Sequence, residues 1–152
     1  MPIQKDIALL DPKMQAGVKK LLAISAAEGI PCAVVETRRE LAVQMAYYSR
    51  GRCAAQYVKD YFKAAGLWAI SDAEAVVVST KTLDSLHILG LAVDIAPTQA
   101  GKVWYDAPAE IWSKLYVLAE DECGLDACYG GQWNSWKWDR PHFEFHTEVF
   151  YG

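Results

Sequence analysis

The spacing of apolar residues divides the chain into a helical first half and a second half that carries strands. After Asp11, which a proline follows as in a helix cap and first turn, apolar side chains recur every three or four residues until Gly29. This pattern predicts a helix over residues 12–28. The same spacing predicts two shorter helices, which end near Gly51 and Gly66.

Short runs rich in β-branched residues predict three strands, over residues 31–36, 75–79 and 91–96. Pro97 is expected to close the third strand, and one more helix is expected from Pro108 to just before Gly124. At residues 142–146, polar side chains alternate with aromatic ones, which is typical of a half-buried strand. Segregated helices and antiparallel strands predict an α+β fold, a helical N-terminal half packed on a small antiparallel sheet.

Length and composition fit a single domain over residues 1–152, because 53% apolar residues can build a normal core. The net charge is −4, and no basic block is interleaved with aromatic residues, so nucleic acid is not an expected partner. The first residues show no apolar segment of signal-peptide length, and no run of about eighteen apolar residues occurs. We therefore expect a protein that is made in the cytoplasm and does not span a membrane. We also expect a monomer.

Two histidines and two carboxylates stand in a pattern that is typical of a catalytic zinc site. They lie in Ser-x-His-x-x-Gly-x-Ala-x-Asp at residues 85–94 and in Asp-Arg-Pro-His at residues 139–142. Catalytic zinc usually takes three His, Asp or Glu ligands and leaves one position for water, whose proton a nearby carboxylate accepts. Gly90 can bend the chain between His87 and Asp94. A mid-strand carboxylate such as Asp94 is costly to bury without a cation or a donor, which favours a metal.

Each of these residues also has a purely structural interpretation. His87 can cap a loop, Asp94 can accept hydrogen bonds from backbone amides, and Asp139 can be a turn residue before a proline. These alternatives are stronger for any one residue alone, whereas the two motifs together favour zinc.

The last predicted strand offers three possible ligands on one face, His142, Glu144 and His146. His142 is the favoured ligand because it lies nearest the turn that presents Asp139. Glu144 is expected to orient a ligand imidazole, and His146 is expected at an edge or on the surface.

These motifs resemble the zinc peptidases of the D-alanyl-D-alanine carboxypeptidase and L-alanyl-D-glutamate endopeptidase group, which are related to hedgehog and lysostaphin folds. Upstream, Glu-Thr-Arg-Arg at 36–39, Gln44 and Gly-Arg at 51–52 are similar to the segment that places an arginine and a glutamine beside the substrate. The run Gly-Gly-Gln-Trp at 130–133 is similar to the aromatic-glycine run before the last ligand. The resemblance extends from about Asp11 to the C-terminus.

The resemblance implies a role for each matching residue. The zinc ligands would be His87, Asp94 and His142, and the general base would be Asp139. Substrate contacts would come from Arg39, Gln44 and Trp133, with Ser85 supporting the site by hydrogen bonding. A guanidinium suits a substrate carboxylate because its planar N–H groups can donate two parallel hydrogen bonds to the two carboxylate oxygens. Arg38 is the alternative to Arg39 for binding the substrate carboxylate. Because side chains alternate along a strand, the two arginines are expected on opposite faces.

The resemblance also implies a function, a zinc-dependent peptidoglycan hydrolase that cuts the stem peptide at the L-alanyl-D-glutamate bond. An aspartate as base is similar to the phage-lysin branch, which implies an endolysin that acts on the cell wall after the host membrane is permeabilised. One alternative is a D-alanyl-D-alanine carboxypeptidase or dipeptidase, which would share all the metal residues. Another is a catalytically silent zinc-binding or wall-binding module, against which Asp139 and an open coordination position count, because structural zinc sites are generally closed.

Overall fold

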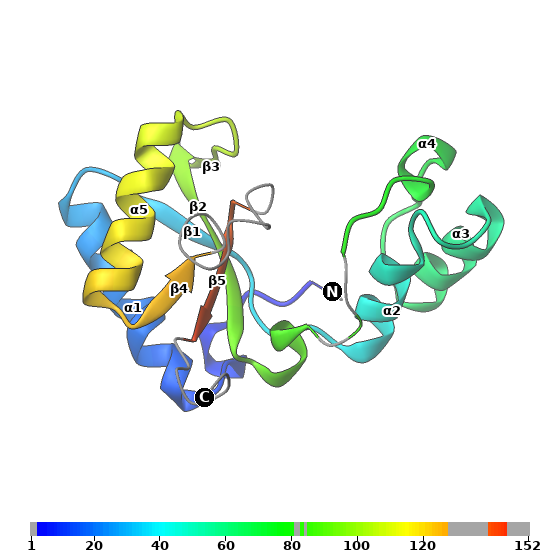
Figure 1. Cartoon of the computed structure of the whole chain (residues 1–152), viewed down its shortest axis with the longest axis horizontal. Helices are drawn as coiled ribbons and strands as arrows, with labels where there is room; N and C mark the ends of the chain where they lie inside the picture. Colours follow the sequence, from blue (N-terminus) through cyan, green and yellow to red (C-terminus); the bar gives the residue numbers. More distant parts are fainter. Residues whose placement is uncertain (1–2, 81–82, 84, 128–139, 146–152) are drawn as a thin grey trace.

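A sheet covered by two long helices forms one part of the molecule, and a group of shorter helices stands beside it (Figure 1). The computed structural model describes residues 3–80, 83, 85–127 and 140–145. Among these residues, no helix combines the length and the apolar character that crossing a membrane requires.

The predicted α+β fold is confirmed. The helices are α1 Pro12–Ala27, α2 Leu41–Ser49, α3 Ala55–Ala64, α4 Asp72–Ala75 and α5 Ala109–Glu122, with short 3-10 helices η1 Ile7–Leu9 and η2 Leu86–Leu89. The strands are β1 Cys32–Glu36, β2 Ala92–Gln99, β3 Lys102–Val103, β4 Leu125–Ala127 and β5 His142–Phe145. Asp11 caps α1 as expected, because its side chain accepts a hydrogen bond from the backbone N–H of Lys13 at 2.9 Å.

The sheet is antiparallel, with the strand order β1-β2-β5-β4, and β3 pairs with the end of β2. Helices α1 and α5 pack on one face and share a core with it, to which Val93 and Ile95 of β2 belong. Because successive side chains of a strand alternate between faces, Asp94 points to the face opposite this core. The fold thus presents Asp94 where a site can form.

Helices α2, α3 and α4 have a small core of their own, built from Ala46, Val58, Phe62, Ile70 and Ala75. This core is a separate cluster from the one between the sheet, α1 and α5. The described residues therefore form two cores, and the first half of the chain contributes to both.

Two expectations about strands are wrong. Residues 75–79 form no strand, because α4 ends at Ala75 and Val76, Val77 and Val78 are each at least 49% exposed. Hydrogen bonds instead connect the two ends of this segment to residues that follow α2. The backbone N–H of Gly51 donates to the carbonyl of Ala75 at 2.9 Å, and the Arg52 guanidinium donates to the carbonyl of Thr80 at 2.9 Å. Tertiary hydrogen bonds have overridden a local β propensity.

Pro97 does not close its strand, since β2 continues to Gln99. The ladder between β2 and β5 ends at Asp94, and beyond it the Pro97 carbonyl accepts a hydrogen bond from the backbone N–H of Trp104 at 2.8 Å. A proline is tolerated here because it lies past the last residue that pairs with β5.

Gly90 makes the predicted bend between His87 and β2, with a left-handed φ of 73°. A Cβ there would meet the backbone nitrogen of Asp11 at 2.9 Å. We expect Gly90→Ala to lower the free energy of unfolding by about 2 to 4 kcal/mol, from backbone strain and overpacking together. The matched control is Gly29→Ala, because Gly29 also has a positive φ of 81° but nothing within 4 Å of an added Cβ. Urea unfolding measures the free energy of unfolding of both variants. An equal decrease in the two would contradict the role of the close contact.

Candidate metal centre

His87 is presented by η2 and is buried, with 2% of its surface exposed. Ser85 caps this short helix, because its Oγ accepts a hydrogen bond from the backbone N–H of His87 at 3.3 Å. The imidazole Nδ1 lies 2.8 Å from the carbonyl oxygen of Thr37. A carbonyl only accepts hydrogen bonds, so Nδ1 carries a proton, and the lone pair of a neutral ring is on Nε2. His87 is thereby oriented to bind a cation through Nε2.

Asp94 lies in the middle of β2, between the two imidazoles. Its Oδ1 is 3.2 Å from Nε2 of His87 and 3.6 Å from Nδ1 of His142. Burial by itself raises the pKa of this carboxyl, but the nearby His87 and His142 outweigh burial and hold the pKa below its ordinary value. Asp94 is therefore ionised and available as a ligand.

His142 lies on β5 directly opposite Asp94 in the antiparallel pairing. Its Nε2 is 2.8 Å from Oε1 of Glu144, which shares its face of the strand. A carboxylate accepts this hydrogen bond, so Nε2 carries the proton and Nδ1 faces Asp94. This contact agrees with the expectation that Glu144 orients a ligand imidazole.

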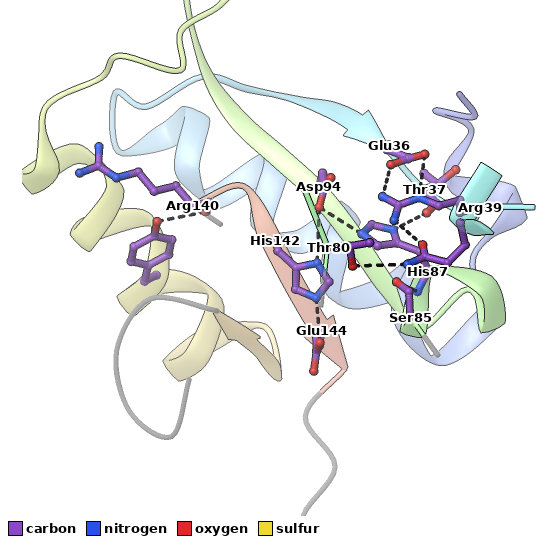
Figure 2. A network of polar contacts seen from close by, with 12 residues as sticks. Glu36, Thr37, Arg39, Thr80, Ser85, His87, Asp94, Arg140, His142 and Glu144 are labelled. Carbon is purple, nitrogen blue, oxygen red and sulfur yellow. Dashed lines mark hydrogen bonds and ion pairs between the residues drawn. The ribbon is translucent and has the colours of Figure 1, made fainter. Parts of the chain in front are cut away.

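The three predicted ligands converge on one point, as Figure 2 shows. Each of His87, Asp94 and His142 offers one donor atom, and these atoms all lie within 4.8 Å of one another. When both imidazoles are neutral, their lone pairs and the carboxylate repel one another unless a proton or a metal cation lies between them. Two nitrogen donors and one carboxylate oxygen suit zinc, whose catalytic sites commonly have three such ligands.

Arg39 is buried beside this group, whereas its rival Arg38 is exposed, so the two arginines differ as expected. Arg39 binds Glu36 in a bidentate manner, through Nη2 to Oε1 and through Nε to Oε2, the latter at 3.2 Å. Its Nη1 donates to Oε1 of Gln44 at 2.6 Å, and Gln44 Nε2 is 3.4 Å from Oγ1 of Thr80. Arg39 and Gln44 are thus part of one buried polar network. Figure 2 labels Arg39 and its partner Glu36 in this network.

Two predicted site residues, Asp139 and Trp133, lie outside the described residues, as does His146. The other predicted residues, His87, Asp94, His142, Arg39, Gln44 and Ser85, all lie in or next to the site described above.

Sequence reasoning missed two partners in this site. The carbonyl of Thr37 orients His87, but a backbone atom carries no signal of residue type. Glu36 binds Arg39. The one sequence feature that indicates this pairing is the position of Glu36 three residues before the arginine in the motif.

Comparison with known proteins agrees with this geometry. The family described as D-alanyl-D-alanine carboxypeptidase matches residues 78–145, the segment that carries His87, Asp94 and His142. No curated protein matches the chain in sequence.

Several solved structures have a similar fold. The L-Ala D-Glu endopeptidase ChiX of Serratia marcescens is 23% identical, with a TM-score of 0.59 over 95% of this chain and 86% of that one. The LD-carboxypeptidase LdcB is 16% identical, with a TM-score of 0.58 over 93% of this chain and 61% of that one. The vancomycin resistance D,D-pentapeptidase VanY, solved in complex with Zn(II), is 18% identical, with a TM-score of 0.55 over 91% and 73%.

The fold, the three donors and the family match over residues 78–145 together make this chain similar to metallopeptidases. The predicted resemblance to the zinc D-alanyl-D-alanine carboxypeptidase and L-alanyl-D-glutamate endopeptidase group is confirmed, and so is zinc as the predicted cofactor.

Proposed function

We propose that this chain is a zinc-dependent peptidase that hydrolyses the stem peptide of peptidoglycan at the L-alanyl-D-glutamate bond. The observation that carries the proposal is the convergence of His87, Asp94 and His142, with each imidazole proton held on the far side of its ring. The choice of bond is supported by the likeness to ChiX, which is described as an L-Ala D-Glu endopeptidase.

In this proposal, His87, Asp94 and His142 hold the zinc. When bound, zinc supplies a Lewis acid that polarises a peptide carbonyl and makes a water molecule more acidic. Asp139 takes a proton from the attacking water and returns it to the leaving amine, as expected for a general base. Ser85 maintains η2 and with it the position of His87.

Arg39 is proposed to bind a carboxylate of the substrate. Its contacts with Glu36 and Gln44 use the Nε hydrogen and one hydrogen on each terminal nitrogen, so one N–H on Nη1 and one on Nη2 remain beyond those contacts. Gln44 holds one side of the guanidinium and in this way contributes to substrate binding. Trp133 is proposed as a further substrate contact.

A second candidate function is a D-alanyl-D-alanine carboxypeptidase, which the description of the matching family favours. A silent zinc-binding module is a weaker candidate. Structural zinc sites are usually closed by four ligands and rich in cysteine, whereas the described part of the chain offers three donors, His87, Asp94 and His142, none of them cysteine.

The deciding experiment is mass spectrometry of the fragments released from purified murein and from defined muropeptides. Cleavage at the proposed bond leaves a new N-terminus on D-glutamate, whereas a carboxypeptidase releases only terminal D-alanine. A chelator should stop the reaction, and added zinc should restore it. If neither product forms with zinc present, the proposed activity is wrong.

We further propose that the protein acts as an endolysin. The support is the aspartate at position 139 before the last ligand, which is similar to the phage-lysin branch of the group. In this role the protein is made in the host cytoplasm and reaches the wall after the membrane is permeabilised. Loss of turbidity of permeabilised cells, compared with intact cells, tests this role.

Glu144 should affect zinc binding although it is not a proposed ligand. We expect Glu144→Ala to weaken zinc affinity by about 10- to 100-fold, because the proton on Nε2 of His142 loses its acceptor. Glu144→Gln keeps an acceptor oxygen, so its zinc affinity should fall less than that of Glu144→Ala. Competition with a chromogenic chelator measures both affinities, and unchanged affinity in Glu144→Ala would contradict an orienting role.

A further inference from the structure

An irregularity in β1 places the buried carboxylate of Glu36 beside the half-buried carboxylate of Asp94. Val34 pairs with Ile95, but Glu36 pairs with Asp94, so β1 holds one extra residue between these pairs. In a regular ladder, Glu36 would lie opposite Val93 and face the core. The bulge instead turns Glu36 to the face of Asp94, and bulges are frequent next to active sites for this reason.

Two carboxylates in directly opposite positions repel each other, and Glu36 is only 5% exposed. The repulsion is offset because Arg39 covers both oxygens of Glu36 through its Nε and Nη2. Asp94, in contrast, faces the two imidazoles. The two carboxylates thus have different partners, and only Asp94 belongs to the group of metal donors.

The guanidinium of Arg39 is held on three sides. Glu36 of β1 binds one edge, Gln44 of α2 accepts from Nη1 at 2.6 Å, and the ring of Tyr47 lies below, with its centroid 4.8 Å from Cζ. Glu36 supplies two of these contacts and the only charged partner among them. Without Glu36, the Tyr47 ring and the Gln44 amide would have to fix the guanidinium alone.

We propose that Glu36 is a positioning residue that acts on the substrate through Arg39. It fixes the plane of the guanidinium so that the remaining N–H groups on Nη1 and Nη2 keep one direction for a substrate carboxylate. This inference rests on the proposed function of the site, and it gives a role to the glutamate of the Glu-Thr-Arg-Arg motif at 36–39. Bidentate pairing with a carboxylate restricts a guanidinium more than any single hydrogen bond does.

The test is a double-mutant cycle on the zinc-loaded enzyme with a defined muropeptide. Its variants are Glu36→Gln, Arg39→Met and the double variant. An amide offers one acceptor oxygen and presents its NH2 to the second donor of Arg39, so the bidentate contact is lost. We expect Glu36→Gln to lower kcat/KM by about 100-fold, as misplacement of a substrate-binding group does. Zinc content and chelator competition should stay at wild-type values.

The double variant should be no worse than Arg39→Met alone, because Glu36 acts only through Arg39. A loss that persists when the arginine is already absent would show a general structural role and overturn the proposal. So would a Glu36→Gln enzyme with normal kcat/KM, or one that loses zinc. Asp72→Asn is the matched control, since it breaks the exposed ion pair with Lys59 and should leave kcat/KM unchanged.

Two further measurements keep the test decisive. If Glu36→Gln does not fold, the kcat/KM of the double variant can still be compared with that of Arg39→Met. The double variant should fold, because both charges are removed and no buried charge is left unpaired. The NMR signal of the Arg39 Nε–H should exchange faster with solvent in Glu36→Asp than in the wild type, and equal exchange would contradict the proposal. This signal does not depend on activity, so failure of the proposed function, seen as a wild type without product, is distinguishable from failure of the inference.

Discussion

Replacing His87 by alanine is expected to remove zinc and nearly all peptidase activity. Two ligands, Asp94 and His142, remain, and they are too few for a stable site. Zinc that binds only the folded state adds to its stability by about 2.7 kcal/mol when the metal is at 100 times its dissociation constant. The variant should therefore melt at a lower temperature than the zinc-loaded wild type, and elemental analysis should find no zinc.

Adding a chelator to the wild type and to His87→Ala distinguishes the loss of metal from other effects of this substitution. The wild type should lose thermal stability when a chelator is added, whereas the melting temperature of His87→Ala should not respond. Ser85→Ala is the control for disturbance of η2, because it removes the cap but no proposed ligand. It should be less stable by about 1 kcal/mol and still bind zinc. A His87→Ala protein with full zinc occupancy would remove His87 from the ligand set.

Replacing Asp139 by asparagine is expected to have the second large effect, on the reaction alone. The amide has nearly the same shape but cannot take a proton from the attacking water. We expect kcat to fall by about 10²- to 10⁴-fold, the usual contribution of a general base. Zinc content and thermal stability should be those of the wild type, as measured by elemental analysis and calorimetry.

The pH dependence of the residual activity provides a second check. If Asp139 is the base, the acidic limb of the wild-type kcat/KM profile should disappear in Asp139→Asn. Asp106→Asn changes an exposed aspartate in the same way and should keep both the rate and the profile. Near-normal turnover of Asp139→Asn would show that another group accepts the proton.

The convergence of His87, Asp94 and His142 could be predicted because the signals for it are local. Gly90 has the positive φ that the bend after His87 requires, and alternation along β2 turns Asp94 away from the core. His142 follows from the same alternation in β5. In each case, one short segment of sequence fixes the conformation that presents the side chain.

The contacts between distant segments could not be predicted in this way. Val76 to Val78 favour a strand by composition, but Gly51 and Arg52, far away in sequence, hold the neighbouring residues in another conformation. The bulge that places Glu36 opposite Asp94 depends on how two strands pair, which neither strand shows alone. The short strands β3 and β4 lack enough residues for a periodic pattern.

The presence of two separate cores has a consequence for how such an enzyme can diversify. The strands that carry Asp94 and His142 are anchored in the core with α1 and α5, whereas Tyr47 beside Arg39 packs against the core of α2 to α4. Substitutions at distant, independently packed positions usually have additive effects. If the proposed function holds, new preferences for peptide sequence can therefore accumulate in the smaller helical unit while the metal donors stay unchanged.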